Sequence, residues 1–415
     1  MSTSKSKRGA RWLLPRLALA LLAALISLAA VEGGARLYLG NAFVQDLPIG
    51  RPDRACAQPD PVLGWSNLPN ARARVDAPRF SYWLQINSRG LRDTEHTFQK
   101  KPGTLRIALL GDSLAWGWGV DNGKAFADIV ERDLGPDVEV INFGVPGYST
   151  DQELLAFERD GVNYEPDLVL LCFVLNDVVG NHQRESQGRF KPHLERRGAE
   201  WVMAPCPPPR PVTDKLREFS TPEWLYWHSA VLQAANPPDG EKQLASEASR
   251  VTGGADTEGP DRDAPLPDRS AEDDQIKALC EEVADESSPS YALLGKLSEA
   301  CRSRKLPLVA FSIAHHHDKY LYWVDVPRPT PAGPELRTLL TERLADAGRR
   351  LGFQTFSVDQ AMFEETGKGH VLTCGDSHLN ELGNQVVARR IVEELRPLLA
   401  KIRGGGDPAA IPPVR

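Results

Sequence analysis

The amino-acid sequence predicts an α/β fold in which a central parallel sheet is covered by helices on both faces. Two observations support this prediction. From residue 105 onward, short apolar segments alternate with longer segments of helical pattern, as they do in chains that build parallel sheets. Several of the apolar segments, such as LVLLCFV at residues 168–174, are continuously hydrophobic, which is typical of strands buried on both faces.

Composition and length exclude some classes of protein. The chain has 415 residues, which is long for a single typical domain, and 41% of them are hydrophobic, enough for a sizeable core. The formal net charge is −7, and no basic stripe occurs outside the first sixteen residues. We therefore expect no nucleic-acid partner. The sequence gives no indication of the oligomeric state.

The N-terminus carries a targeting signal. A basic leader at residues 1–11 precedes an Ala- and Leu-rich segment at residues 12–31. Its fully apolar part is short for a membrane span, and small residues around Ser27 offer a cleavage site, so a signal peptide and an uncleaved transmembrane anchor both remain open. We favour the anchor, because Arg16 can extend its charge to the membrane surface. Either reading places the remainder outside the cytoplasm: the anchor gives a single-pass protein of the cell membrane, and cleavage gives a secreted or periplasmic one.

Export makes the six cysteines relevant, because disulfides form in oxidising compartments. Their spacing is irregular and includes no CxxC pair, so it predicts neither a particular disulfide pairing nor a metal site. Cys172 lies inside an apolar strand and is expected to be a small core residue.

The elements follow in order. Residues 32–103 form a β-rich extracytoplasmic preface, in which the alternating segment FSYWLQI at residues 80–86 is expected to be an edge strand. The main domain spans residues 104–403, and residues 404–415 form a flexible tail. Strands are expected at residues 105–110, 138–142, 168–174, 306–311 and 353–358. Helices are expected at residues 124–134, 288–301 and 334–351, after a capping box at residues 150–153, and from near Glu381.

The alternation is lost in an insertion at residues 181–288. Residues 236–274 are acidic, rich in glycine and proline and free of aromatic residues, which predicts a mobile surface segment. Residues 221–232 show a helical pattern with Trp224 and Trp227 on one face. Such a helix would either pack on its own domain, which we favour, or act as a lid or a membrane-facing element.

Polar residues follow the strands at the edge where the strands end. Ser113 comes after the first strand, Gly144 after the second and Asn176 after the third, and His378 lies in the final strand-to-helix loop. Parallel strands end at one edge of a sheet, so these residues should lie together. A serine hydroxyl needs a base such as histidine to become a nucleophile. The backbone N–H groups of Ser113 and Gly144 and the side-chain amide of Asn176 could then bind the oxyanion.

These segments resemble the four sequence blocks of the SGNH, or GDSL, hydrolase family. The blocks correspond to Gly111-Asp112-Ser113, Asn142-Phe143-Gly144, Asn176-Asp177, and Asp376 with His378. The resemblance implies a flavodoxin-like three-layer α/β/α sandwich, Ser113 as nucleophile, Gly144 and Asn176 as oxyanion donors, His378 as base and Asp376 as the acid that orients it. Asp376 lies two residues before the histidine, whereas three is the commoner spacing. A serine–histidine pair helped by a backbone carbonyl is therefore the alternative.

Three further groups of residues are more easily explained by structure than by chemistry. The consecutive His315, His316 and His317 point in different directions and make a poor chelate, so a loop is expected there. Trp116 and Trp118 could line the pocket, but Trp118 is expected to pack under the first helix. Asp112 and Asp177 are expected to brace turns through backbone N–H groups. No cofactor and no metal is expected.

Three functions from different classes remain. The first is a serine esterase acting on acyl groups, including O-acetyl groups, of a carbohydrate or lipid. The second is an O-acyltransferase that uses the same serine to modify an exported polysaccharide. The third is a catalytically silent scaffold of a cell-envelope assembly, which the complete set of blocks disfavours.

Overall fold

The computed structural model describes residues 56–76, 80–186, 189–207, 270–313, 334–374 and 378–405, together with Ala23 and residues 27–31. The chain divides into two compact units, one formed by residues 1–50 and 210–256, the other by residues 51–209 and 257–415. In the first unit only Ala23 and residues 27–31 are described, and they are helical. Within the described part of the chain, no helix is both long and apolar enough to cross a membrane. Every other element described below belongs to the second unit.

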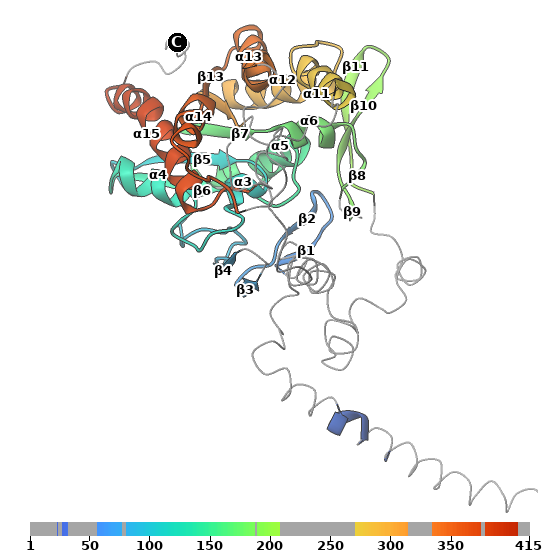
Figure 1. The fold of residues 1–415 in the computed structure, drawn as a ribbon, viewed down its shortest axis with the longest axis vertical. Helices are drawn as coiled ribbons and strands as arrows, with labels where there is room; N and C mark the ends of the chain where they lie inside the picture. Colours follow the sequence, from blue (N-terminus) through green and yellow to red (C-terminus); the bar gives the residue numbers. More distant parts are fainter. Residues whose placement is uncertain are drawn as a thin grey trace, which may run out of the picture. The chain divides into compact units, whose positions relative to one another are not determined.

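A five-stranded parallel sheet forms the centre of this unit (Figure 1). Its strands are β5 (Leu105–Leu110), β6 (Val138–Asn142), β7 (Leu168–Phe173), β12 (Leu308–Ser312) and β13 (Gln354–Ser357). They lie in the order β6-β5-β7-β12-β13, and all neighbours are parallel. The five predicted strands are confirmed, each within two residues at either end. The sheet begins with β5. The next strand in the sequence, β6, pairs with one edge of β5, and β7 then pairs with the other edge. The strand order therefore reverses between β5 and β7, and open α/β sheets bind ligands at such a point, beside the carboxyl ends of the strands.

Helices cover both faces of the sheet. Successive residues of a strand point to opposite sides, so strands that are apolar at nearly every position give the sheet two apolar faces. Ile107 and Leu109 belong to one hydrophobic cluster, and Ala108 and Leu110 belong to the other. The first cluster includes residues of α4 (Phe126–Leu134), α14 (Asp359–Gly367) and α15 (Glu381–Arg403). The second includes residues of α5 (Thr150–Arg159), α12 (Pro289–Arg302) and α13 (Pro334–Leu351). The three-layer sandwich is thus confirmed, and each fully buried aliphatic side chain contributes ~1.5–3 kcal/mol to it.

The ends of two helices show what local sequence signals can specify. Ser288 caps α12 by accepting a hydrogen bond from the Tyr291 N–H at 3.0 Å, as the Ser-Pro signal predicts. The predicted capping box at the start of α5 is wrong. Ser149 is the N-cap residue, and the Glu153 side chain is buried rather than turned back to the helix end. The first turn of α5 packs into the protein interior, which overrides the local capping pattern.

The N-terminal region forms two hairpins, as expected of a β-rich preface. The first consists of β1 (Ala57–Asp60) and β2 (Gly64–Asn67), and the second of β3 (Arg72–Asp76) and β4 (Ser81–Gln85). The first hairpin packs on the loop that follows β6. Trp65 Nε1 donates to the Pro146 carbonyl at 3.1 Å, and the Tyr148 hydroxyl donates to the Trp65 carbonyl at 2.6 Å. In β4, exposed and buried residues alternate as predicted for an edge strand.

The insertion contains more regular structure than the sequence predicts. A helix, α6 (Leu175–Asn181), directly follows β7 and ends where the insertion begins, and two hairpins follow it within the insertion. Their strands are β8 (Glu185–Ser186), β9 (Arg189–Phe190), β10 (His193–Arg197) and β11 (Glu200–Ala204). The segment predicted to be mobile includes the start of a further helix, α11 (Ser270–Glu282), so that prediction is wrong for residues 270–274. Residues 236–269, the predicted helix at 221–232 and the three consecutive histidines lie outside the described residues.

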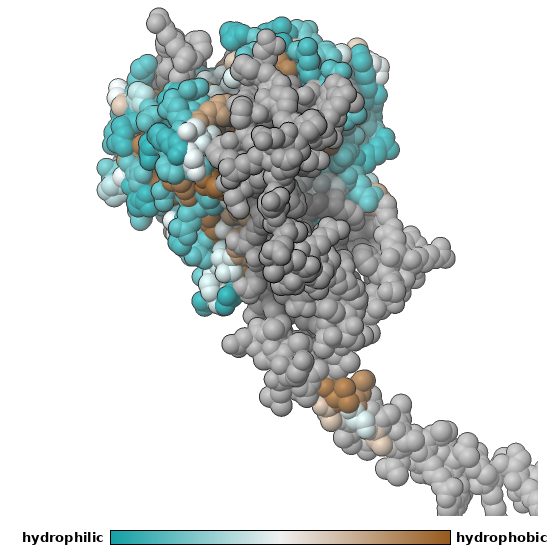
Figure 2. All heavy atoms as spheres, viewed as in Figure 1, coloured by the Kyte–Doolittle hydropathy of each residue, from teal (hydrophilic) through white to brown (hydrophobic). Residues whose placement is uncertain are grey.

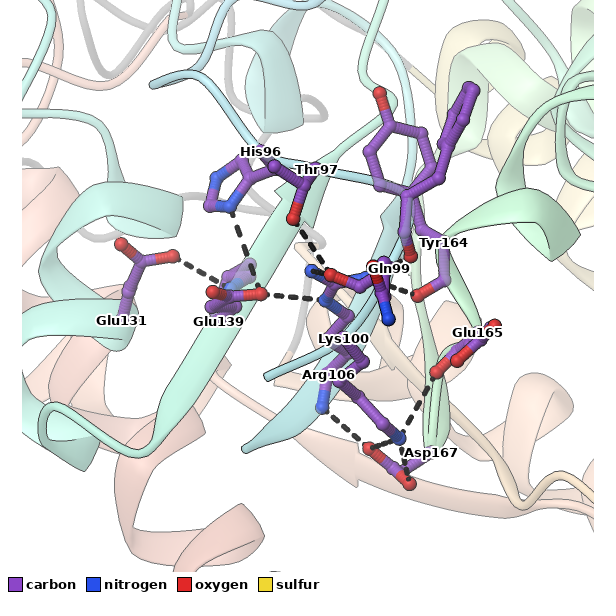
Figure 3. A network of polar contacts seen from close by, with 12 residues as sticks. His96, Thr97, Gln99, Lys100, Arg106, Glu131, Glu139, Tyr164, Glu165 and Asp167 are labelled. Carbon is purple, nitrogen blue, oxygen red and sulfur yellow. Dashed lines mark hydrogen bonds and ion pairs between the residues drawn. The ribbon is translucent and has the colours of Figure 1, made fainter. Parts of the chain in front are cut away.

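A buried network of polar groups ties together the amino-terminal ends of β5 and β7 (Figure 3). The fully buried Arg106 donates from Nε to Glu139 Oε2 at 2.6 Å and from Nη1 to the carbonyls of Phe98 and Tyr164. Its backbone N–H donates to Asp167 Oδ2 at 2.7 Å. A buried guanidinium is tolerated because its donors are paired with carbonyls and a carboxylate. This network lies at the edge of the sheet opposite Ser113.

The described surface shown in Figure 2 is largely hydrophilic, which agrees with a charged exterior over an apolar core. All six cysteines belong to the described residues, and no two of them are joined by a disulfide. Cys172 is fully buried in β7, as predicted.

Candidate active site

Ser113 lies where β5 ends, as the first residue of the short helix α3 (Ser113–Trp116). The preceding residue, Asp112, caps this helix, because its Oδ1 accepts a hydrogen bond from the Leu114 N–H at 2.9 Å. Asp177 braces the turn after β7 in the same way, accepting from the Val174 N–H at 2.7 Å. Both carboxylates therefore have the turn-bracing role predicted for them. Ser113 is 8% exposed, so most of this residue is buried within the turn.

His378, near the C-terminal end of the domain in sequence, lies beside Ser113 in the structure. Its Nε2 lies 2.9 Å from Ser113 Oγ, although 265 residues separate the two in the sequence. Residues on both sides of the histidine are fixed: its carbonyl accepts from the Cys374 N–H at 2.8 Å, and Asn380 caps α15 through the Gly383 N–H at 2.9 Å. The Ser–His pair predicted from the sequence is therefore brought together at hydrogen-bonding distance, the geometry that general-base catalysis requires.

The predicted oxyanion donors also lie at this edge, and two of them, Gly144 and Asn176, have partners. The Gly144 N–H donates to Asn142 Oδ1 at 2.9 Å. Asn176 Nδ2 donates to Asp112 Oδ2 at 2.6 Å, which leaves the second hydrogen of the amide for another acceptor. Among the described residues, the Ser113 N–H has no acceptor, as is usual for the first turn of a helix.

Gly144 is required at its position by close packing against α3. A Cβ atom there would lie 2.4 Å from the Trp116 backbone nitrogen and 2.8 Å from the Ala115 carbonyl carbon. Asn142 also contacts α3, because its Nδ2 donates to the Ala115 carbonyl at 2.7 Å. The Asn142 side chain, to which the sequence alone gave us no reason to assign a role, links the Gly144 amide to the nucleophile helix in the structure. Only its place in the second block hinted at such a role.

A group of buried charges lies beneath the site. Burial, reinforced by the neighbouring Asp112 carboxylate, raises the pKa values of Glu153 and Asp177 well above their ordinary range. Lys191 forms an ion pair with Asp151 in which both side chains are fully buried. Burial lowers the pKa of Lys191 and raises that of Asp151. No group of three or more described His, Cys, Asp or Glu residues could hold a metal ion.

Trp118 lies in a different environment from the one predicted. Trp118 does not pack under the first helix; its ring stacks on the His378 imidazole, with ring centroids 5.0 Å apart and an angle of 23° between the planes. Trp116 is the tryptophan that is buried in the core. Both tryptophans follow the nucleophile turn, and nothing in their local sequence distinguishes them. The predicted acid, Asp376, lies outside the described residues.

The fold and the site define an α/β protein that carries a serine–histidine pair at the carboxyl edge of a parallel sheet. The particular family follows from residues 109–386, more than half of the chain, which match the family model of the GDSL-like lipase/acylhydrolase family. The chain belongs to this family and is an ester hydrolase. The resemblance inferred from the four sequence blocks is thus confirmed.

The solved structures that match this chain are distant in sequence. A lipase/acylhydrolase from Enterococcus faecalis is 14% identical, with a TM-score of 0.33, over 71% of this chain and 96% of that one. A lipolytic protein of the G-D-S-L family from Veillonella parvula is 13% identical, with a TM-score of 0.35, over 70% and 97%. The psychrotrophic esterase EstA from Pseudoalteromonas sp. is 11% identical, with a TM-score of 0.34, over 71% and 98%. No curated protein sequence matches this chain.

Proposed function

We propose that this protein is a serine esterase that removes acyl groups, including O-acetyl groups, from a carbohydrate or lipid outside the cytoplasm. The observation that carries the proposal is the 2.9 Å distance between His378 Nε2 and Ser113 Oγ, at the edge of the sheet where ligands bind. The basic leader and the apolar segment at residues 12–31 support an extracytoplasmic location at the membrane. Acyl esters exposed on envelope carbohydrates and lipids would then be within reach.

In the proposed reaction, Ser113 Oγ attacks the ester carbonyl while His378 Nε2 accepts its proton. The resulting oxyanion accepts hydrogen bonds from the Ser113 N–H and from the second hydrogen of Asn176 Nδ2. The Gly144 N–H would be a third donor if its hydrogen were shared between the oxyanion and Asn142 Oδ1, or if it left Asn142 Oδ1 for the oxyanion. The protonated histidine then donates to the alcohol that leaves, and water attacks the acyl-enzyme with His378 again acting as base. Asp376 is the proposed acid that orients the imidazole.

The nucleophile can be tested with Ser113→Ala and a fluorophosphonate probe. The hydroxyl is required for covalent catalysis and contributes little to packing. The variant should therefore lose p-nitrophenyl acetate turnover and probe labelling while keeping its urea unfolding midpoint. Ser287→Ala, which changes an exposed serine between α11 and α12, is the matched control and should react normally. Persistent labelling of the Ser113→Ala protein would remove Ser113 from the nucleophile role.

An O-acyltransferase is the second candidate, since a sugar hydroxyl can replace water as the acceptor for the same acyl-enzyme. The two functions differ in their products. Incubation with acetylated oligosaccharides and a non-acetylated acceptor, followed by mass spectrometry, should give free acetate for an esterase and a newly acetylated acceptor for a transferase. Transfer exceeding hydrolysis would replace the esterase proposal.

A further inference from the structure

We propose that Trp118 is a positioning residue for the catalytic base: its ring holds the His378 imidazole against Ser113 and stabilises the imidazolium that forms during catalysis. The proposal deepens the function proposed above and rests on it. The sequence blocks assign no role to this residue. The geometry points to it because, within the described part of the chain, Ser113 Oγ lies 2.9 Å from His378 Nε2 while the Trp118 ring stacks on the imidazole face.

The nucleophile and the stacking ring are parts of one tight turn. The N–H groups of Gly117 and Trp118 both donate to the Ser113 carbonyl, at 3.1 and 3.0 Å. The position of the Trp118 backbone is therefore fixed relative to Ser113 itself. A ring carried on this turn can place the histidine relative to the nucleophile with little freedom between them, because precise placement depends on rigid supporting contacts.

A buried arginine from the preface holds this turn closed. Arg92 Nη1 donates to the Trp116 carbonyl at 2.7 Å and also to the Gly117 carbonyl, and its Nη2 donates to the Val120 carbonyl. Its guanidinium lies 4.7 Å from the centroid of the Trp116 ring. These contacts bracket Trp118 on both sides in the sequence. The N-terminal region thus contacts the backbone of the turn that carries Trp118.

Cys374, whose N–H donates to the His378 carbonyl, lies against Gly119, the residue after Trp118. Gly119 has φ of 93°, and a Cβ atom there would lie 2.5 Å from Cys374 Sγ. Cys374 Sγ approaches the Gly119 carbonyl at 3.7 Å. The absence of a side chain at position 119 allows the histidine loop to approach the turn closely, which brings the imidazole onto the Trp118 ring.

Stacking affects the two protonation states of the base differently. The face of an indole ring attracts a cation, and this attraction is strongest when the pair is partly shielded from water, as it is here for two half-buried rings. Since the imidazolium exists only after His378 has accepted the serine proton, the stabilisation acts on the transition state more than on the resting enzyme. Loss of the ring should therefore lower kcat and leave KM nearly unchanged.

The kinetic test compares Trp118→Leu, Trp118→Phe and Trp83→Leu with the unmodified protein on p-nitrophenyl acetate. Trp83 is 51% exposed and is the matched control. We expect Trp118→Leu to lower kcat about tenfold or more with KM within about twofold, Trp118→Phe to restore most of this loss because it retains an aromatic face, and Trp83→Leu to have no effect. A kcat for Trp118→Leu within twofold of the unmodified protein, or an equal loss with Phe and Leu, would overturn the proposal.

A second test does not depend on catalysis and therefore separates this proposal from the proposed function. Protonated imidazole quenches indole fluorescence on contact more strongly than the neutral ring. The fluorescence of Ser113→Ala is measured together with that of the double variant Ser113→Ala, Trp118→Phe. The difference between the two spectra is the emission of Trp118, and this emission should decrease as the pH is lowered. The same titration with His378→Ala should remove this decrease. If the emission of Trp118 titrates equally with and without His378, the stacking proposal fails, whatever role Ser113 has.

Discussion

Replacing Lys191 with methionine tests whether the buried charges beneath the site stabilise the fold. Lys191 Nζ donates to Asp151 Oδ2 and to the carbonyls of Gly180, at 3.0 Å, and Gln183, at 3.3 Å. Methionine fills a similar volume but leaves the Asp151 carboxylate buried without its cation. Removal of one member of a buried ion pair costs ~3–5 kcal/mol. We expect a loss of this size, a large fraction of the ~5–15 kcal/mol that stabilises a typical domain.

Urea unfolding followed by circular dichroism measures this loss. With a slope of about 3 kcal/mol per molar urea, a loss of ~4 kcal/mol lowers the midpoint by about 1.3 M. Lys124→Met is the matched control, since Lys124 pairs with Glu381 at 2.6 Å on the exposed surface, and such pairs contribute less than ~1 kcal/mol. Adding Asp151→Asn to Lys191→Met should recover part of the stability, because the amide oxygen can still accept from the Gln152 N–H.

The loss should also depend on pH. Without Lys191, the pKa of Asp151, already raised by burial, rises further, so the unfolded chain releases this proton at lower pH than the folded protein does. The stability of the variant then decreases as the pH rises above the ordinary aspartate value of 3.8. The deficit should be larger at pH 7 than at pH 4. A deficit below ~1 kcal/mol at pH 7, or one that grows toward acid, would refute the reasoning.

Three further predictions concern the site and the residues beneath it. Glu153→Gln should stabilise the protein by more than ~1 kcal/mol at pH 8, with the gain vanishing below pH 4.5 in urea titrations, because burial raises the pKa of Glu153 and the folded protein therefore disfavours its charged form; equal gains at both pH values would contradict this. Gly144→Ala should lower kcat ~10-fold or more and destabilise the domain by ~1–3 kcal/mol, since its Cβ meets backbone atoms, whereas Gly367→Ala, with no atom within 4 Å, should not. Asp376→Asn should lower kcat ~10⁴-fold, and the loss should barely add to that of His378→Ala if the two act as a unit; near-normal activity would favour a Ser–His dyad.

Local patterns in the sequence were sufficient for the layers of the fold. The strand at Leu105–Leu110 is apolar at nearly every position and feeds two separate clusters, so its composition alone indicates burial on both faces. The Ser288 cap and the helix Pro334–Leu351 were predictable for the same reason, because capping and helical periodicity depend on neighbours within a few residues. Where elements are short, this signal is too weak. Helix α6 has seven residues and β8 has two, too few to establish a period.

The contacts that assemble the site depend on the path of the whole chain. Which tryptophan enters the core and which lies on His378 is decided by Arg92 and by the loop at Cys374, both distant in sequence from the nucleophile turn. Likewise, Glu153 fits a capping pattern locally, but its side chain is buried in the structure, where burial and the charges of Asp177 and Asp112 raise its pKa. The sequence alone determined the layers, the strand ends and the residues of the Ser–His pair, because these follow from periodicity and motif. Only the tertiary structure decided what surrounds that pair, because side chains from distant segments compete for the same space and only one arrangement fills it.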